Sequence, residues 1–455
     1  MTQTAVSPAR TSLALFVGGF VTFSLLYSVQ PLLPTLADEF QVNAATSSLA
    51  LSVASGALAL SMLAAAALAD RKGRRPAMVA SVVASSLISL LVPLCPTFPL
   101  FLGVRLLLGA ALAGLPAVAM AYLAEEVSAE TLGAAMGIYI AGNALGGMSG
   151  RLTVGLLTHA SSWRTALAVQ GGICLLASLW FARNLPPSRH FRPSDVDMEA
   201  AIRNIRAALA SPALRPLFAI PFLLMGSFSA LYNYIAFLLM KPPYSLDHAQ
   251  VGWIFLLYLV GMIGSAALGR LADRVGRARI LPLGIVLQGC GAVVTLLPGL
   301  WTKVAGVGLF TFGFFGAHAT ASGWVGARSG ELKATAATLY LLAYYAGVTF
   351  GGWIGGYFWI HLGWGGVVLM CSLAVAGALG VALRIGAASM RPPRGTPSGA
   401  PRQGAASGRM SRKMFPRTGT ASSSTDPPCA SAVPFTSESP RPVPPISRER
   451  PPSTR

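Results

Sequence analysis

The stretch Leu68-Ala69-Asp70-Arg71-Lys72-Gly73-Arg74-Arg75 decides the fold, because a near copy, Leu271-Ala272-Asp273-Arg274-Val275-Gly276-Arg277-Ala278, follows it 203 residues later. Each copy lies between two long apolar stretches. A short charged segment with a glycine, placed between two apolar stretches, predicts a loop that joins two membrane spans. The two copies therefore predict a duplicated set of membrane spans.

The similarity between the two parts extends well beyond this loop. The pentapeptide at 23–27, Phe-Ser-Leu-Leu-Tyr, recurs at 228–232 as Phe-Ser-Ala-Leu-Tyr, and Trp163 has a counterpart in Trp364. The glycines of 142–147 recur within 347–352. The offsets between matching positions stay between 201 and 205 residues. Such a steady offset over a whole half of the chain indicates an ancestral duplication.

Composition assigns the chain to a class of protein. Of its 455 residues, 54% are hydrophobic and 11% are charged, whereas an ordinary soluble domain has roughly 25% charged residues. A water-soluble globule is therefore excluded. Residues 11–385 divide into about twelve apolar segments of about 20 residues, each long enough to cross ~30 Å of hydrocarbon as a helix. The sequence predicts an all-α membrane protein with twelve transmembrane helices in two pseudo-symmetric six-helix bundles. The expected spans begin near residues 11, 47, 77, 98, 131, 164, 215, 249, 279, 302, 334 and 364.

The formal net charge of +19 would suggest a nucleic-acid partner for a soluble protein, but here the basic residues follow the topology. With the N-terminus inside, 17 Lys and Arg residues of positions 1–385 fall on cytoplasmic segments, and three fall on external ones, namely Arg164, Lys241 and Lys303. This distribution is the positive-inside bias of membrane proteins. It predicts two cytoplasmic termini, a lipid bilayer around the chain and no nucleic-acid partner. The five cysteines are far apart, so neither a disulfide framework nor a zinc site is indicated. No cofactor is expected.

The chain divides into four expected parts. Residues 1–184 and 215–385 are the two six-helix bundles, and 185–214 is a cytoplasmic linker with an amphipathic helix. The last part, 386–455, contains 14 of the 32 prolines and 11 Lys or Arg residues against three acids. That composition is typical of a disordered basic tail.

The duplicated loop resembles the signature of the major facilitator superfamily, glycine-x-leucine-alanine-aspartate-arginine-x-glycine-arginine. Ala66 stands in place of the first glycine in one copy, whereas the other copy keeps it as Gly269. In that family the loop holds one bundle against the other and is released when the transporter changes state. The resemblance implies that Asp70 faces the start of span eleven and Asp273 the start of span five. It implies coupling or gating roles for Asp70, Arg71, Gly73, Arg74, Asp273, Arg274, Gly276 and Arg277.

Two further patterns resemble those of the same family. Arg105-Leu106-Leu107-Leu108-Gly109 is similar to the arginine-x-x-x-glycine motif of proton-coupled members, which implies a coupling or gating role for Arg105. Residues 142–147 resemble the span-five signature of drug:proton antiporters, with Asn143 where proline is usual. Their glycines also suit close helix packing, which explains them equally well. A second arginine inside a span, Arg151, either has a function or extends its side chain toward the outer membrane surface.

The substrate site is expected between the bundles, since the family lines its cavity with spans one, four, seven and ten. Aromatic and polar side chains there suit an amphipathic or aromatic ligand, because a tyrosine combines a broad apolar face with one hydroxyl. Packing between helices would account for many of the same residues. The candidates for substrate binding are Tyr27, Gln30, Asn143, Tyr232, Asn233, His318 and Tyr344.

Proton coupling has few candidates in this sequence. No Asp or Glu lies in the middle of an expected span, although a carboxylate there is a common proton carrier in the family. The remaining candidates are Asp38, Glu125 and His318. His318 lies well inside a span, and an imidazole can change its charge at physiological pH. A histidine that only packs between helices is the alternative.

Parallel repeats with a substrate site near the bilayer midplane are typical of secondary transporters. The resemblance implies a transporter of a bacterial inner membrane that exports a small hydrophobic or aromatic compound in exchange for protons, and a monomer is expected. A second hypothesis changes the substrate to a sugar or an amino-acid-like metabolite. A third is a membrane sensor that does not transport and that signals through the basic tail. An enzyme is not expected, because the sequence shows no nucleophile-base pair, metal cluster or phosphate-binding loop.

Overall fold

The computed structural model describes residues 8–191 and 198–390. Within these ranges the chain forms α-helices and short 3-10 helices, and no β-strand. The all-α fold class that the sequence predicts is therefore confirmed. The expected basic tail lies outside the described residues from position 391 onward.

The first half of the chain begins with a broken helix, in which α1 (Pro8–Tyr27) leads through η1 (Gln30–Leu32) into α2 (Leu33–Glu39). The break has a sequence cause, because Pro31 and Pro34 have no backbone N–H to continue the helix. The other helices of this half are α3 (Ala44–Lys72), α4 (Arg74–Ser89), η2 (Val92–Leu94), α5 (Phe98–Leu112), α6 (Gly114–Glu126), α7 (Ala129–Ala160) and α8 (Trp163–Asn184).

The helix α9 (Met198–Ala210) follows, within the stretch where the sequence predicts an amphipathic linker helix. The second half repeats the pattern of the first. Its elements are α10 (Arg215–Leu239), α11 (His248–Gly252), η3 (Trp253–Leu256), α12 (Leu257–Val275), α13 (Arg277–Val294), α14 (Leu300–Arg328), η4 (Gly330–Leu332) and α15 (Lys333–Met390).

Ten helical segments of the described chain are long and apolar enough to cross a membrane. One of them contains two spans, because Gly363, with φ 59° and ψ −147°, interrupts the 58 residues of α15. α7 is not one of these ten, but its 32 residues are long enough to span a membrane. If α7 is counted, the described chain has twelve span-length helices. Each span begins within three residues of the position expected from the sequence. The structure therefore contains the expected pair of six-span halves.

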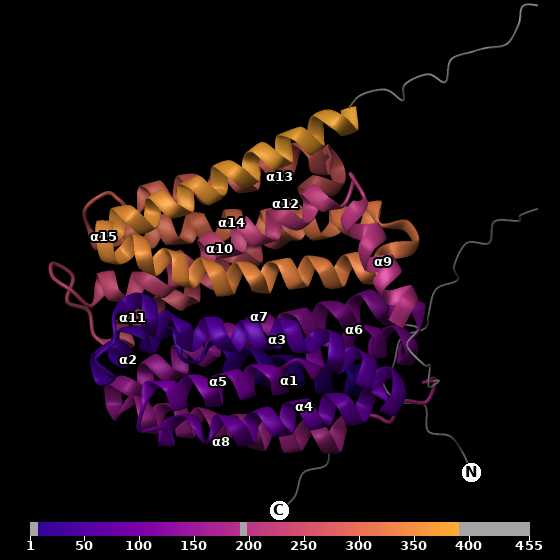
Figure 1. The fold of residues 1–455 in the computed structure, drawn as a ribbon, viewed down its shortest axis with the longest axis horizontal. Helices are drawn as coiled ribbons and strands as arrows, with labels where there is room; N and C mark the ends of the chain where they lie inside the picture. The colour runs from indigo at the N-terminus through magenta and orange to yellow at the C-terminus, as the bar shows by residue number, and fades with distance from the viewer. Residues whose placement is uncertain (1–7, 192–197, 391–455) are drawn as a thin grey trace, which may run out of the picture. The chain divides into compact units, whose positions relative to one another are not determined.

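Figure 1 shows the helices of the first half, in indigo and purple, beside those of the second half, in magenta to yellow. We call the end of the helices that holds Gly73 and Gly276 the loop end, and the opposite end the far end. α9 lies at the loop end, and α2 and α11 lie at the far end. Gly73 and Gly276 have φ values of +105° and +101°. Residues that have a Cβ atom rarely adopt such positive φ values. This conformation explains why both copies of the loop contain a glycine at this position.

Glycines bring pairs of helices into backbone contact within each half. A Cβ atom at Gly142 or Gly146 of α7 would overlap the backbone of α1, and one at Gly347 or Gly351 of α15 would overlap the backbone of α10. These are the glycines that the sequence repeats at an offset of 205 residues. The same close packing therefore holds spans one and five together in the first half, and spans seven and eleven in the second.

The two halves contact each other at the far end. α3 packs against α15, α10 packs against η1 and α2, and α7 packs against α11. One of these contacts is made by glycines: a Cβ atom at Gly155 of α7 would lie 3.0 Å from the carbonyl oxygen of His248 and 3.2 Å from the Cα atom of Gly252. The backbones of the two halves therefore touch directly at this point.

Candidate functional site

Arg105 is buried inside the first half and bonds to backbone carbonyls. Its Nε donates to the Ala50 oxygen at 2.8 Å, its Nη2 to the Leu26 oxygen at 2.7 Å and its Nη1 to the Leu25 oxygen at 3.2 Å. Leu25 and Leu26 belong to the last turn of α1, where carbonyls lack helical partners. The guanidinium therefore closes the broken end of α1 and ties α5 to α1 and α3.

Arg151 begins a hydrogen-bonded chain that crosses from one half to the other. This arginine of α7 is 1% exposed, so its side chain does not extend to the membrane surface. Its Nε donates to Gln30 Oε1 at 2.5 Å, and its Nη1 donates to the Gly147 oxygen at 2.6 Å. The amide nitrogen of Gln30 donates in turn to Asn233 Oδ1 of α10 at 2.7 Å. Two predicted site residues, Gln30 and Asn233, are thus brought together across the boundary between the halves.

Aromatic rings from both halves surround the Arg151 guanidinium. Its Cζ atom lies 3.9 Å from the centre of the Tyr27 ring and 4.7 Å from that of the Tyr258 ring. The hydroxyl groups of Tyr27 and Tyr344 are close enough to interact. Among the described residues, no carboxylate forms an ion pair with Arg151. Ring faces, which carry negative potential, and neutral amides therefore stabilise this buried charge.

His318 of α14 belongs to the same aromatic cluster. Its ring lies 5.2 Å from the Tyr344 ring, and it stacks on Phe314 at 5.8 Å. Its Nδ1 is 2.9 Å from the hydroxyl of Tyr340. The imidazole is therefore held at a fixed orientation, with one nitrogen engaged by a tyrosine.

Tyr232 and Asn233 are neighbours in α10 with different environments. The Tyr232 hydroxyl is 2.7 Å from Thr311 Oγ1 inside the second half, and its ring packs against Phe228, Phe255 and Tyr258. The Asn233 Nδ2 atom, in contrast, is buried and has no hydrogen-bond partner. Ser52 Oγ, also without a partner, lies near it above Gly352. Two polar groups on opposite halves therefore have unused hydrogen-bonding capacity at the same place.

Ion pairs surround the first copy of the signature loop. Arg74 contacts both oxygens of Glu125, at 2.7 Å from Nε and 2.6 Å from Nη2, and its Nη1 lies 3.1 Å from Asp70 Oδ1. Glu125 is the penultimate residue of α6, so this ion pair connects the loop to the end of span four. Asp70 thus has a partner within its own half.

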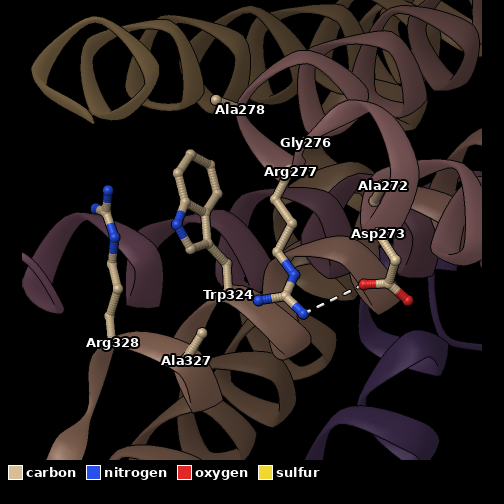
Figure 2. Close-up of a pocket in the computed structure, with 8 residues that line it drawn as sticks. All are labelled: Ala272, Asp273, Gly276, Arg277, Ala278, Trp324, Ala327 and Arg328. Carbon is tan, nitrogen blue, oxygen red and sulfur yellow. Dashed lines mark hydrogen bonds and ion pairs between the residues drawn. The ribbon is translucent and has the colours of Figure 1, made fainter. Parts of the chain in front are cut away.

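The second copy of the loop borders a hollow. Arg277 Nη2 lies 3.4 Å from Asp273 Oδ1. Beside this pair is a cavity of about 470 Å³, which Trp324 and Arg328 of α14 also line. Figure 2 shows the Trp324 ring between the side chains of Arg277 and Arg328.

Other predicted residues lie apart from the central cluster. Asp38 is exposed in the last turn of α2 at the far end, and Asn143 of α7 is directed at Gly19 of α1, within the first half. Arg71 and Arg274 are exposed at the loop end.

The cluster also contains residues that the sequence did not single out. In the sequence, Tyr258 is one aromatic residue among many in an apolar span. Its position at the boundary is apparent only from its contact with Arg151 of the other half.

Comparison with known proteins assigns the family. The family model described as Major Facilitator Superfamily matches residues 15–242 and 227–433, and so covers most of the chain. The chain belongs to the major facilitator superfamily. The resemblance of the signature loop is therefore confirmed.

Two bacterial relatives support the same assignment. The MFS-type transporter YybF of Bacillus subtilis (strain 168) is 45% identical over 370 residues, which cover 81% of this chain and 92% of the relative. The inner membrane transport protein YnfM of Escherichia coli (strain K12) is 41% identical over 376 residues, which cover 83% and 90%. This chain is accordingly a multi-pass membrane transporter.

Solved structures share its fold. A bacterial homologue of the human lysosomal transporter Spinster, in an inward-facing and occupied conformation, matches with a TM-score of 0.65 at 16% identity and covers 84% of this chain and 95% of that chain. The nucleoside transporter NupG matches with a TM-score of 0.65 at 14% identity, over 83% and 99% of the two chains. At these identities the likeness concerns the fold alone.

Proposed function

We propose that this superfamily member exports small hydrophobic or aromatic compounds by alternating access, in exchange for protons. The observation that carries the proposal is the ring cluster at the boundary of the halves. Tyr27 from the first half and Tyr258, His318 and Tyr344 from the second lie together around Arg151 at this boundary. In this proposal the substrate binds beside these rings, between the two repeats. Tyrosine and histidine rings offer stacking faces next to the Arg151 guanidinium, which suits an aromatic ligand.

The contacts between the halves support a state that is closed at the far end. Gln30 with Asn233, Tyr234 with the Ala44 oxygen, and Thr35 with His248 all join the halves there. The arginine-rich loop end supports a cytoplasmic location for that end and for both termini. The name of the relative YnfM supports a bacterial inner membrane.

We further assign the coupling and gating roles by family analogy. In this proposal Asp70 and Arg74 with Glu125 stabilise one loop, and Asp273 with Arg277 the other. The chain acts as a monomer whose bundles are 1–184 and 215–385, joined by 185–214.

His318 is the best-placed proton carrier of this proposal. Its ring lies inside the aromatic cluster, and its Nδ1 contacts the Tyr340 hydroxyl at 2.9 Å. Glu125, in contrast, is engaged by Arg74, and Asp38 lies at the surface of the far end. Binding of a proton at His318 would add a positive charge beside the substrate and would change the affinity of the site for it.

The test is uptake into proteoliposomes with an imposed pH gradient, using a panel of aromatic dyes, antibiotics, sugars and amino acids. Tyr344→Ala should reduce dye movement at least tenfold, whereas Tyr357→Ala, which changes a tyrosine of α15 that is 63% exposed, should not. Asp70→Asn serves as a mechanically impaired control. If His318→Ala and Asp38→Asn both retain gradient-driven transport, the proposed coupling is wrong.

A hydroxylated metabolite, such as a sugar, is the second candidate substrate. The unpartnered Asn233 Nδ2 and Ser52 Oγ favour it, because a ligand hydroxyl could bond both groups. Movement of a sugar that Asn233→Leu abolishes, without any movement of dyes, would replace the aromatic proposal with this one.

A further inference from the structure

Two arginines are buried inside the spans of the first half, and their partners come from different parts of the molecule. The Arg105 guanidinium donates to three backbone carbonyls of its own half. The Arg151 guanidinium donates to Gln30, also of the first half. It lies in addition 5.4 Å from the centre of the Phe255 ring and 4.7 Å from that of the Tyr258 ring, and both rings belong to the second half. Movement of the halves in alternating access therefore changes the surroundings of Arg151 and leaves those of Arg105 as they are.

The buried charge of Arg151 has no fixed counter-ion in residues 8–191 and 198–390. Every aspartate and glutamate in these ranges lies near a helix end or in a connecting segment, and none of them forms an ion pair with Arg151. A buried charge without a counter-ion is costly, and here only ring faces and neutral polar groups compensate for it. The boundary beside Arg151 therefore has a positive potential, which favours an anion over a cation.

Separation of the halves would remove part of this compensation. Phe255 and Tyr258 would move away with the second half, so that Arg151 would keep only its partners of the first half. Gln30 would at the same time lose Asn233 Oδ1, which accepts a hydrogen bond from its amide nitrogen at 2.7 Å. A guanidinium and an amide N–H on adjacent side chains would then both need an acceptor. A carboxylate has two oxygens and can accept from both groups.

We propose that the substrate is an aromatic carboxylate, whose ionised carboxyl group binds Arg151 and Gln30 and whose ring packs against the rings at the boundary. The inference rests on the proposed function, because it uses the same aromatic cluster. The charged and the aromatic parts of this cluster are contiguous. The Tyr27 ring lies 3.9 Å from the guanidinium, the Tyr27 and Tyr344 hydroxyls are close enough to interact, and the Tyr344 ring lies 5.2 Å from that of His318.

The charge of the site distinguishes this substrate from other aromatic compounds. An aromatic cation would meet a guanidinium and no carboxylate among the described residues inside the spans. A neutral aromatic compound would pack against the rings but would leave the charge of Arg151 uncompensated. A single carboxylate, in contrast, balances the single charge of one arginine, and the flat guanidinium matches its two oxygens.

The test measures binding by the purified full-length protein in detergent, without a proton gradient, by isothermal titration calorimetry. Three probes have the same ring and differ in charge: benzoate, benzamide and benzylammonium. We expect benzoate to bind about tenfold or more tightly than benzamide, and benzylammonium to bind most weakly. Arg151→Gln should make the affinities for benzoate and benzamide equal within about twofold. Arg164→Gln is the matched control and should keep the preference, because Arg164 is 41% exposed and pairs with Glu39 outside the cluster.

The outcomes separate this inference from the proposed function. Equal binding of benzoate and benzamide by the wild type, weakened alike by Tyr344→Ala, overturns the inference and leaves the aromatic site standing, as does tighter binding of benzylammonium. Binding of none of the three probes overturns both. A preference for benzoate that Arg151→Gln retains in full contradicts the role of Arg151. If Arg151→Gln does not fold, Arg151→Lys, which keeps the charge but not the flat fork of donors, should reduce the preference without abolishing it. Because no gradient is applied, a failure of proton coupling does not alter these results.

Discussion

Replacing Gln30 with alanine should open the far end of the transporter. In the closed arrangement, Gln30 accepts a hydrogen bond from Arg151 at 2.5 Å and donates one to Asn233 at 2.7 Å. Without the glutamine side chain, Arg151 Nε and Asn233 Oδ1 would stay buried without partners as long as the halves remain together. Separation of the halves would expose both groups to water, which satisfies them. The substitution therefore destabilises the closed state relative to the open one.

The size of this effect follows from the two groups left unpaired. Each buried group without a hydrogen bond costs about 1–3 kcal/mol, and water that enters the vacated space recovers part of this cost. A net shift of about 2–4 kcal/mol corresponds to a change of roughly 30- to 1000-fold in the ratio of open to closed molecules. A minor open population of a few per cent would then become the major one.

Distances between spin labels at the far end measure this population. Ser161→Cys and Lys241→Cys place one label on each half at exposed positions, after the five native cysteines have been replaced. Gln170→Ala is the control, because Gln170 is also buried but bonds to Ser24 within the first half, at 2.5 Å. We expect a longer distance in Gln30→Ala and an unchanged one in Gln170→Ala. An unchanged distance in both variants would refute the reasoning.

Three further predictions concern stability, measured by thermal unfolding in detergent. Arg105→Ala removes three charge-assisted hydrogen bonds between a buried guanidinium and backbone carbonyls, and should lower stability by more than about 3 kcal/mol. We therefore expect little folded protein, and a melting curve close to that of the wild type would contradict this. Gly146→Ala forces a Cβ atom into the backbone of α1 and should lower the unfolding temperature by several degrees, whereas Gly137→Ala, with open space around it, should not. Glu125→Gln removes a bidentate, partly buried partner of Arg74 and should cost about 1–2 kcal/mol at low salt; an equal loss at high salt would argue against an electrostatic origin.

Much of the architecture could be predicted from the sequence, because membrane spans need long apolar stretches and the two loop copies mark a repeat. The span starts and the glycines that pack α7 on α1 follow from patterns along the chain. The partners of the buried arginines do not. Arg105 bonds to backbone carbonyls, which every residue has. Which carbonyls it reaches depends on where Pro31 interrupts α1. No residue type along the chain identifies such a partner.

The candidate site shows the same division. The sequence selects Tyr27, Gln30 and Asn233 as polar residues within spans, but it does not indicate that an arginine of span five joins them. That contact depends on how far each helix is rotated about its axis, which hydropathy does not determine. The arginines beside the second loop, in contrast, have a signal in the sequence. Aligning the ends of spans four and ten places Ala327-Arg328 opposite two acids.

The contact between Gly155 and Gly252 has a consequence for how often the far end can open and close. Side chains that interlock across a boundary must leave and regain their rotamers at every cycle, and each long side chain costs up to about 2 kcal/mol to order. Two glycines bring the surfaces together without any such cost, because neither has a rotamer to lose. At this point the halves can therefore separate and come together again without reordering either of these two residues.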